Sequence, residues 1–495
     1  MGVIFRQSAK STIINLAATF VGFISMVYIY PYNFEFYSYF QTLFSNASIL
    51  LPFLGLGIHG TIIKYYPTFS SLGLQSNFLP YFLKRTIYTT IIGLGLVVTL
   101  FYFGKDDISL IFKNINNVIE YWYVILSLAI LLNLTTVFLY YSNAKLRTVI
   151  PDLIFTAGIK FALPIGIILS YYFKVQLQTF VLWILIYYVV VFISMVLYAL
   201  NLEKVDWRIP KLSIENTNEI NGFMGFSMLN SLGSTLAFRI DIAMIAAMVD
   251  IPSAGLYTYI LTISNVIDLP TKSLNQIAAP VVSQSWTSKN HQNIDDIYTK
   301  SAILGGAVSM MLFLFIYAAW PYILGLIPTE KIPNGLLTTG LLLLLLGLAR
   351  VIDIITGVNS IILSYSHLYK YSLYFLLFMA GLNILMNYIF IQWYGITGAA
   401  LSTLISYTFL QWYKIYFVLN NFKFKLPVSI FYMTLLLLSG LVIVTIIRLP
   451  VHPIIGIIAN SIFSCVYFGI GTWLLNLHNL IRPTVRTLVS TFIKS

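Results

Sequence analysis

Charged residues are scarce in this sequence, and their scarcity argues against a soluble protein. Asp, Glu, Lys and Arg make up 9% of the 495 residues, whereas soluble domains carry roughly 25%. The longest polar intervals, about 201–221 and 284–300, are too short for a soluble domain. The single cysteine, Cys465, excludes an intrachain disulfide. No paired carboxylates and no cluster with metal-ligand spacing appear, so we expect no metal and no cofactor.

Apolar residues dominate instead, at 59% of the chain, with a mean hydropathy of +0.87. A transmembrane helix needs roughly 20 mostly apolar residues. Cutting the chain at polar, proline and charge clusters predicts an all-α polytopic membrane protein with about fourteen transmembrane helices. The predicted spans are 8–30, 38–63, 82–104, 119–141, 149–172, 178–200, 221–248, 254–283, 299–319, 334–357, 367–391, 395–417, 427–447 and 453–476.

The basic residues indicate the orientation. With the N-terminus in the cytoplasm, most of the 28 Lys and Arg residues fall in cytoplasmic loops and termini, as the positive-inside rule requires. The opposite side holds only Lys105, Lys113, Lys174, Lys331 and Arg448. Both termini are therefore predicted to be cytoplasmic. This distribution explains the net charge of +12 without nucleic acid as a partner.

A short repeat indicates two related halves. The segments 37–42 (YSYFQT) and 257–262 (YTYILT) open the second and eighth predicted spans, 220 residues apart from position 37 to 257. Repeats of this parallel kind recur in transporters. We therefore predict a six-helix lobe at 1–205, a second at 206–420, helices 13 and 14 at 421–477, and a cytoplasmic interfacial tail at 478–495.

Several charged residues lie inside predicted spans, where charge is expensive and usually functional. Asp268 and Lys272 are four residues apart and Arg350 and Asp353 three apart, so each pair can meet on one helix face. Arg239 and Asp241 are two apart and should not pair. Arg239 and Lys160 are thus the best candidates for an anionic ligand.

Each of these residues also has a purely structural interpretation. Arg239 can extend to the interface, and Lys272 with Asp268 can serve helix pairing instead of a cavity. For Arg350 and Asp353 we favour a surface pair. His59 can sense protons, but a hydrogen-bonded core histidine is the favoured interpretation. Asp241 and Asp268 are candidate receivers of a coupling Na⁺ or H⁺, or else neutralise nearby cations.

Two stretches resemble the polysaccharide flippases of the multidrug, oligosaccharidyl-lipid and polysaccharide exporter superfamily. They are 238–245 (FRIDIAMI) followed by 254–257 (AGLY), and 387–390 (NYIF) with 394–403 (YGITGAALST). Family members often show Asp before Arg in the seventh helix, whereas Arg239 here precedes Asp241.

This resemblance implies two lobes facing a central cavity that opens alternately to each side of a bacterial inner membrane. The implied cargo is an undecaprenyl-pyrophosphate-linked oligosaccharide, moved to the periplasmic leaflet for O-antigen or other surface polysaccharide. A pyrophosphate needs cations and sugars need polar and aromatic surfaces. The implied binding set is therefore Arg239, Lys160 and Lys272. Membrane lipids, a polysaccharide polymerase and glycosyltransferases are the expected partners of a monomer.

Two other classes remain open. A multidrug cation antiporter of the same superfamily would need an acidic or aromatic cavity, and Arg239 and Lys160 argue against it. A membrane polymerase or glycosyltransferase should show a large loop or a clustered acid and base site. Neither is evident, so we do not expect an enzyme.

Overall fold

A computed structural model describes residues 2–111, 119–210, 214–327, 335–422, 424, 427–446 and 450–474. The predicted interfacial tail, 478–495, lies outside the described residues. The described chain is helical and carries nine helices long and apolar enough to cross a membrane, or up to 11 if each bent helix pair counts as one span. The prediction of an all-α, multi-pass membrane protein is confirmed.

Each predicted span coincides with a helix or a broken helix, because long apolar runs satisfy their backbone groups in a bilayer only by helix formation. The two spans predicted at 367–391 and 395–417 both lie in α16 (Tyr369–Phe422), where non-helical backbone at Gly395 (φ 56°, ψ −133°) separates two helices. The chain divides into two compact units, Met1–Gly255 and Leu256–Ser495. The lobe boundary at residue 205 stays a prediction.

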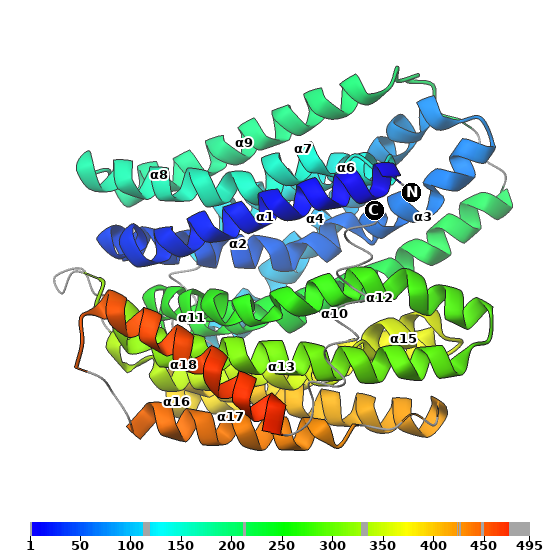
Figure 1. The fold of residues 1–495 in the computed structure, drawn as a ribbon. Coiled ribbons are helices and arrows are strands. Elements are labelled where there is room, and N and C mark those ends of the chain that lie inside the picture. The colour runs from blue at the N-terminus through cyan, green and yellow to red at the C-terminus, as the bar shows by residue number, and fades with distance from the viewer. Residues whose placement is uncertain are drawn as a thin grey trace. The chain divides into compact units, whose positions relative to one another are not determined.

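The first unit is built around α2 and α6. Its elements are α1 (Gly2–Tyr28), η1 (Tyr30–Asn33), α2 (Phe34–Gly55), α3 (Ile58–Ser71), α4 (Gln75–Ile111), α6 (Trp122–Ala144), α7 (Val149–Pro151), the π-helical turn η2 (Asp152–Ala157), α8 (Gly158–Tyr172), α9 (Leu177–Leu202) and α10 (Ile214–Met248). Helix α6 packs between α2 and α9, and α10 packs on α2 and α3 (Figure 1).

Helices α2 and α3 form one span bent by 49°. Two left-handed residues, Leu56 (φ 44°) and Gly57 (φ 81°), make the bend. A side chain at Gly57 would place its Cβ 2.0 Å from the Met224 carbonyl oxygen of α10. Glycine is therefore required here for both the backbone conformation and the close approach of α10.

The second unit is organised around α13 (His291–Leu324). Its other elements are α11 (Ile251–Ser264), which begins in the first unit, η3 (Asn265–Asp268), α12 (Leu269–Thr287), η5 (Leu336–Thr338), α14 (Gly340–Ile354), α15 (Asn359–Tyr365), α16 (Tyr369–Phe422), α17 (Ser429–Ile446) and α18 (Pro453–Leu474). Helices α12, α14, α17 and α18 contact α13, and Figure 1 shows α17 and α18 beside it.

Two of the predicted spans of this unit contain a break. Helices α14 and α15 meet at 45°, with Gly357 (φ 62°) at the break. The 3₁₀ turn η3 separates α11 from α12, within the span predicted at 254–283, and it packs on α14. Broken helices are tolerated in membranes where protein contacts satisfy the freed backbone groups. The breaks place Asp268 and α14 beside each other.

Candidate functional site

Arg239 lies on α10 in the first unit, over an aromatic platform. Its guanidinium carbon is 5.2 Å from the centroid of the Phe44 ring, and Phe44 stacks on Tyr188 at 6.1 Å. The carbonyl of Arg239 accepts a hydrogen bond of 3.3 Å from the Ser45 hydroxyl, which fixes α10 on α2. Among the described residues, no carboxylate lies within 4 Å of the Arg239 nitrogens. The arginine keeps hydrogen-bonding capacity for an anion.

Asp241 follows on the same helix and is buried, at 4% exposure. The spacing of two residues directs its side chain away from that of Arg239 on a helix, and its role as a coupling or neutralising group stays a prediction.

Lys160 is half-buried on α8, where it donates a 3.1 Å hydrogen bond to the Thr19 hydroxyl of α1. Its ammonium therefore lies between α8 and α1. The role of Lys160 in a transport cavity stays a prediction.

His59 makes polar contacts with neighbouring residues in the same unit. Its Nε2 lies 2.8 Å from the Thr136 hydroxyl and 3.3 Å from the Asn133 carbonyl, and its ring stacks on Tyr140 at 5.6 Å. This is the hydrogen-bonded core histidine that the sequence favours.

In the second unit, Arg350 is the centre of a buried polar network. Its Nε lies 3.6 Å from the Asp268 carboxylate, and its Nη1 donates a 2.9 Å hydrogen bond to the Tyr407 hydroxyl. The guanidinium also lies over the Tyr407 ring, 5.3 Å from its centroid. Arg350 is 6% exposed.

Asp353 belongs to a second part of this network. It accepts a hydrogen bond from the Gln411 amide, and the Thr356 hydroxyl lies 3.4 Å from the Gln411 carbonyl oxygen. Tyr407 and Gln411 are four residues apart on α16, so one face of that helix contacts both Arg350 and Asp353.

These contacts correct the predicted surface location of Arg350 and Asp353. Helix α14 is covered by α13, α16 and η3, and its polar groups have tertiary partners. Asp268 ends a 3₁₀ turn and precedes α12, and its ion pair is with Arg350 of α14. The pairing of Asp268 with Lys272 stays a prediction. Lys272 is exposed.

Sequence reasoning missed the aromatic and amide partners. Phe44 and Tyr188 carry no signal in a chain with 36 Phe and 35 Tyr. Gln411 does carry such a signal. A polar amide inside an apolar span is expensive and usually functional, which is the rule that singled out the charged residues. Among the residues the structure describes, no group of three His, Cys, Asp or Glu side chains is arranged to hold a metal ion.

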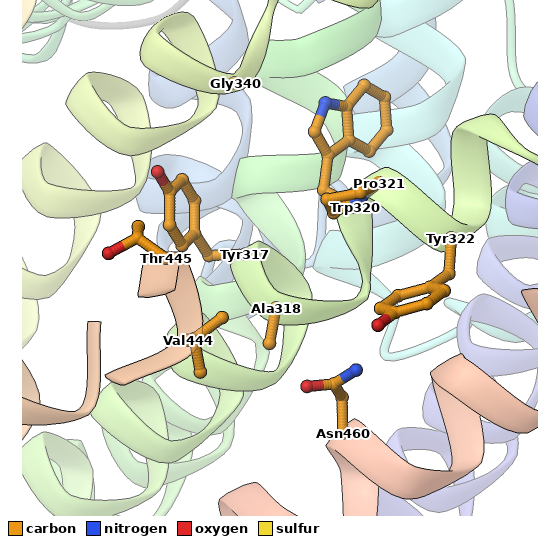
Figure 2. A pocket seen from close by; sticks show the side chains of 9 residues that line it. All are labelled: Tyr317, Ala318, Trp320, Pro321, Tyr322, Gly340, Val444, Thr445 and Asn460. Atoms are coloured by element: carbon orange, nitrogen blue, oxygen red, sulfur yellow. The ribbon is translucent and has the colours of Figure 1, made fainter. Parts of the chain in front are cut away.

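A small cavity of about 50 Å³ lies in the second unit at the ends of α13, α14, α17 and α18. In the view of Figure 2, Tyr317 and Thr445 lie at one end and Tyr322 and Asn460 at the other. Ligand pockets usually measure about 300–1,000 Å³. This cavity has room for a few waters and is too small for an oligosaccharide.

No known family profile matches this sequence, and no curated protein matches it either. Its structure is similar to that of a lipid II flippase, MurJ, in an inward closed conformation, with a TM-score of 0.66 and 15% identity over 94% of this chain and 98% of that chain. It is also similar to an inward-facing multidrug resistance MATE transporter of the MOP superfamily, with a TM-score of 0.62 and 15% identity over 83% of this chain and 98% of that chain. The chain therefore has the fold of the transporters of the multidrug, oligosaccharidyl-lipid and polysaccharide exporter superfamily.

Proposed function

We propose that this protein is a transporter that moves a pyrophosphate-linked lipid oligosaccharide across a bacterial inner membrane by alternating access. The observation that carries this proposal is Arg239, a cation within an apolar helix that contacts aromatic rings and has no carboxylate partner among the described residues. A guanidinium over an aromatic ring offers several N–H donors to a phosphate. A lipid pyrophosphate is the ligand class that uses them best.

Lys160 and Lys272 complete the proposed cationic set. Lys160 lies inside the first unit against a hydroxyl, and exposed Lys272 retains its ammonium for a ligand. Asp241 is the proposed receiver of a coupling Na⁺ or H⁺, because a buried carboxylate changes its interactions when a cation binds. The similarity to a lipid II flippase supports the lipid-linked cargo.

The multidrug antiporter is the second candidate, since a MATE transporter shares the fold. A cationic drug needs carboxylates that are available to it. In the second unit, the carboxylate of Asp268 faces Arg350 and that of Asp353 accepts from Gln411. These carboxylates are occupied by the protein itself, which favours the anionic cargo.

Deletion of the gene tests the function. Lipid-linked repeat units should accumulate on the cytoplasmic leaflet and surface polysaccharide should disappear. Normal surface polysaccharide together with raised drug sensitivity would establish the antiporter instead.

Substitution of Arg239 tests the site. Arg239→Gln should lower export about 10- to 100-fold at limiting substrate, because a hydrogen bond to a charged group contributes roughly 1.5–3 kcal/mol. Arg239→Lys should retain part of the activity. The control is Arg208→Gln, whose side chain is 92% exposed, and membrane levels of all variants are measured by immunoblot. Full export by Arg239→Gln would remove this residue from the mechanism.

A further inference from the structure

The segment that follows α9 has no regular secondary structure and is tied to α4 by hydrogen bonds. We call its described part, Glu203–Pro210, the connecting strap. The Asn77 side-chain amide of α4 donates to the carbonyls of Asp206 and Arg208 at 3.1 and 2.9 Å. The Asp206 N–H in turn donates to the Ser76 carbonyl at 3.0 Å. Three hydrogen bonds thus fix the strap to the start of α4.

The outer side of the strap combines apolar and basic side chains. Trp207 is 63% exposed and Ile209 44% exposed, while the Arg208 side chain is 92% exposed. Val205 packs inward on the core of the first unit. Exposed tryptophan beside basic residues at helix ends is typical of the headgroup region of a bilayer.

A cavity of about 320 Å³ opens where the strap begins, a volume at the lower end of ligand pockets. It is lined by Tyr66, Ala144, Lys145, Leu146, Arg147 and Leu202. Lys145 forms an ion pair with Glu203, the first residue of the strap. Leu146, 49% exposed, adds an apolar side chain at the rim.

The two cationic side chains of this cavity, Lys145 and Arg147, differ in whether they already have an ionic partner. Burial lowers the pKa of the Lys145 ammonium, but its hydrogen bonds to Glu203 and Tyr141 outweigh burial, and the net pKa is raised. Lys145 is thus a fixed positive charge that already has a partner. Arg147 is exposed and forms no ion pair within the described chain.

The charge balance around the cavity favours an anion. Lys145, Arg147, Lys204 and Arg208 lie on residues 144–147 and 202–210, against the carboxylates Glu203 and Asp206. Glu203 pairs with Lys145, and Asp206 lies 3.9 Å from Arg208. Both carboxylates are therefore neutralised locally, and the charges of Arg147 and Lys204 remain.

We propose that this cavity binds the phosphate headgroup of an anionic phospholipid, with Arg147 as the donor to the phosphate. Lys145 and Tyr66 line the cavity beside Arg147, and Leu146 supplies its apolar rim. The exposed Trp207 and Ile209 of the strap would meet the surrounding lipid. The apolar rim selects a lipid over a free phosphate ion, because phosphate gains nothing from it. The bound lipid would hold the connector between the two predicted lobes, independently of what the protein transports.

Lipid binding to the purified full-length protein in detergent tests this proposal. Native mass spectrometry would compare phosphatidylglycerol with phosphatidylcholine of the same acyl chains, with inorganic phosphate as competitor. Wild-type protein should bind phosphatidylglycerol at least tenfold more tightly, and millimolar phosphate should displace it poorly. Equal affinity for the two lipids, or equal affinity for phosphate alone, would overturn the proposal.

Variants assign the binding to Arg147. Arg147→Gln should lose about tenfold in phosphatidylglycerol affinity and Arg147→Lys less, with phosphatidylcholine binding unchanged. Lys289→Gln, an exposed cation of the second unit, is the matched control. Because Arg147 makes no ion pair in the described chain, its loss should leave the melting temperature without added lipid unchanged. Undiminished lipid affinity in Arg147→Gln would refute the assignment.

Discussion

Removal of the Arg350 side chain should be among the most destabilising single changes in the second unit. The guanidinium faces the Asp268 carboxylate at 3.6 Å, with side chains 7% and 18% exposed, and donates to the Tyr407 hydroxyl at 2.9 Å. Arg350→Met keeps most of the apolar stem but leaves Asp268 as a buried carboxylate without its cation. Breaking a buried pair in this way costs about 3–5 kcal/mol. The partial exposure of Asp268 places the expected loss near the lower end, about 3 kcal/mol.

A second variant removes the charge of the Asp268 carboxylate, which Arg350→Met leaves without a cation. Asp268 Oδ1 has no hydrogen-bond partner among the described residues, so little else holds that carboxylate. The double variant Arg350→Met with Asp268→Asn should therefore recover about 1–3 kcal/mol relative to Arg350→Met alone, the usual coupling energy of residues in contact. A net loss remains because the Tyr407 hydroxyl also loses its donor.

Equilibrium unfolding of the purified protein in mixed micelles measures these changes. Lys370→Gln, on an exposed position of α16, is the control and should change the free energy of unfolding by less than about 0.5 kcal/mol. Asp268→Asn is measured alone as well. If the losses of Arg350→Met and Asp268→Asn simply added in the double variant, the ion pair would not be an energetic unit and the reasoning would fail.

Two further predictions concern the first unit. Gly57→Ala should destabilise it by about 2 kcal/mol or more, because the left-handed conformation alone costs roughly 1–2 kcal/mol and the added Cβ would meet the Met224 carbonyl. Gly95→Ala on α4, where an added Cβ would have no neighbour within 4 Å, should be neutral or stabilising in the same thermal unfolding assay. Thr136→Val should cost about 0.5–1.5 kcal/mol by removing the hydroxyl bonded to His59, and Thr136→Ser should restore most of it; equal stability of all three forms would show that this hydrogen bond contributes nothing.

The helices could be predicted almost completely from the sequence, whereas the polar contacts could not. Each predicted span lies on a helical element, since bilayer thickness and backbone hydrogen bonding leave an apolar run few alternatives. The break at η3 had only Pro270 as a signal in the sequence. Spacing along one helix therefore missed Arg350, the ion-pair partner of Asp268, because it lies on another helix, α14.

The sequence by itself determined that this is a multi-pass helical membrane protein with a few charges inside its spans, because composition and the length of apolar runs are local properties. The separation of Arg239 from Asp241 was also local, a matter of helical spacing. Only the tertiary structure decided that Arg350 is buried against Asp268 and Tyr407, whereas Arg239 rests on Phe44 with no carboxylate partner in the described part of the chain. Those partners come from other helices, and which helix faces pack together depends on breaks and close approaches that no single segment encodes.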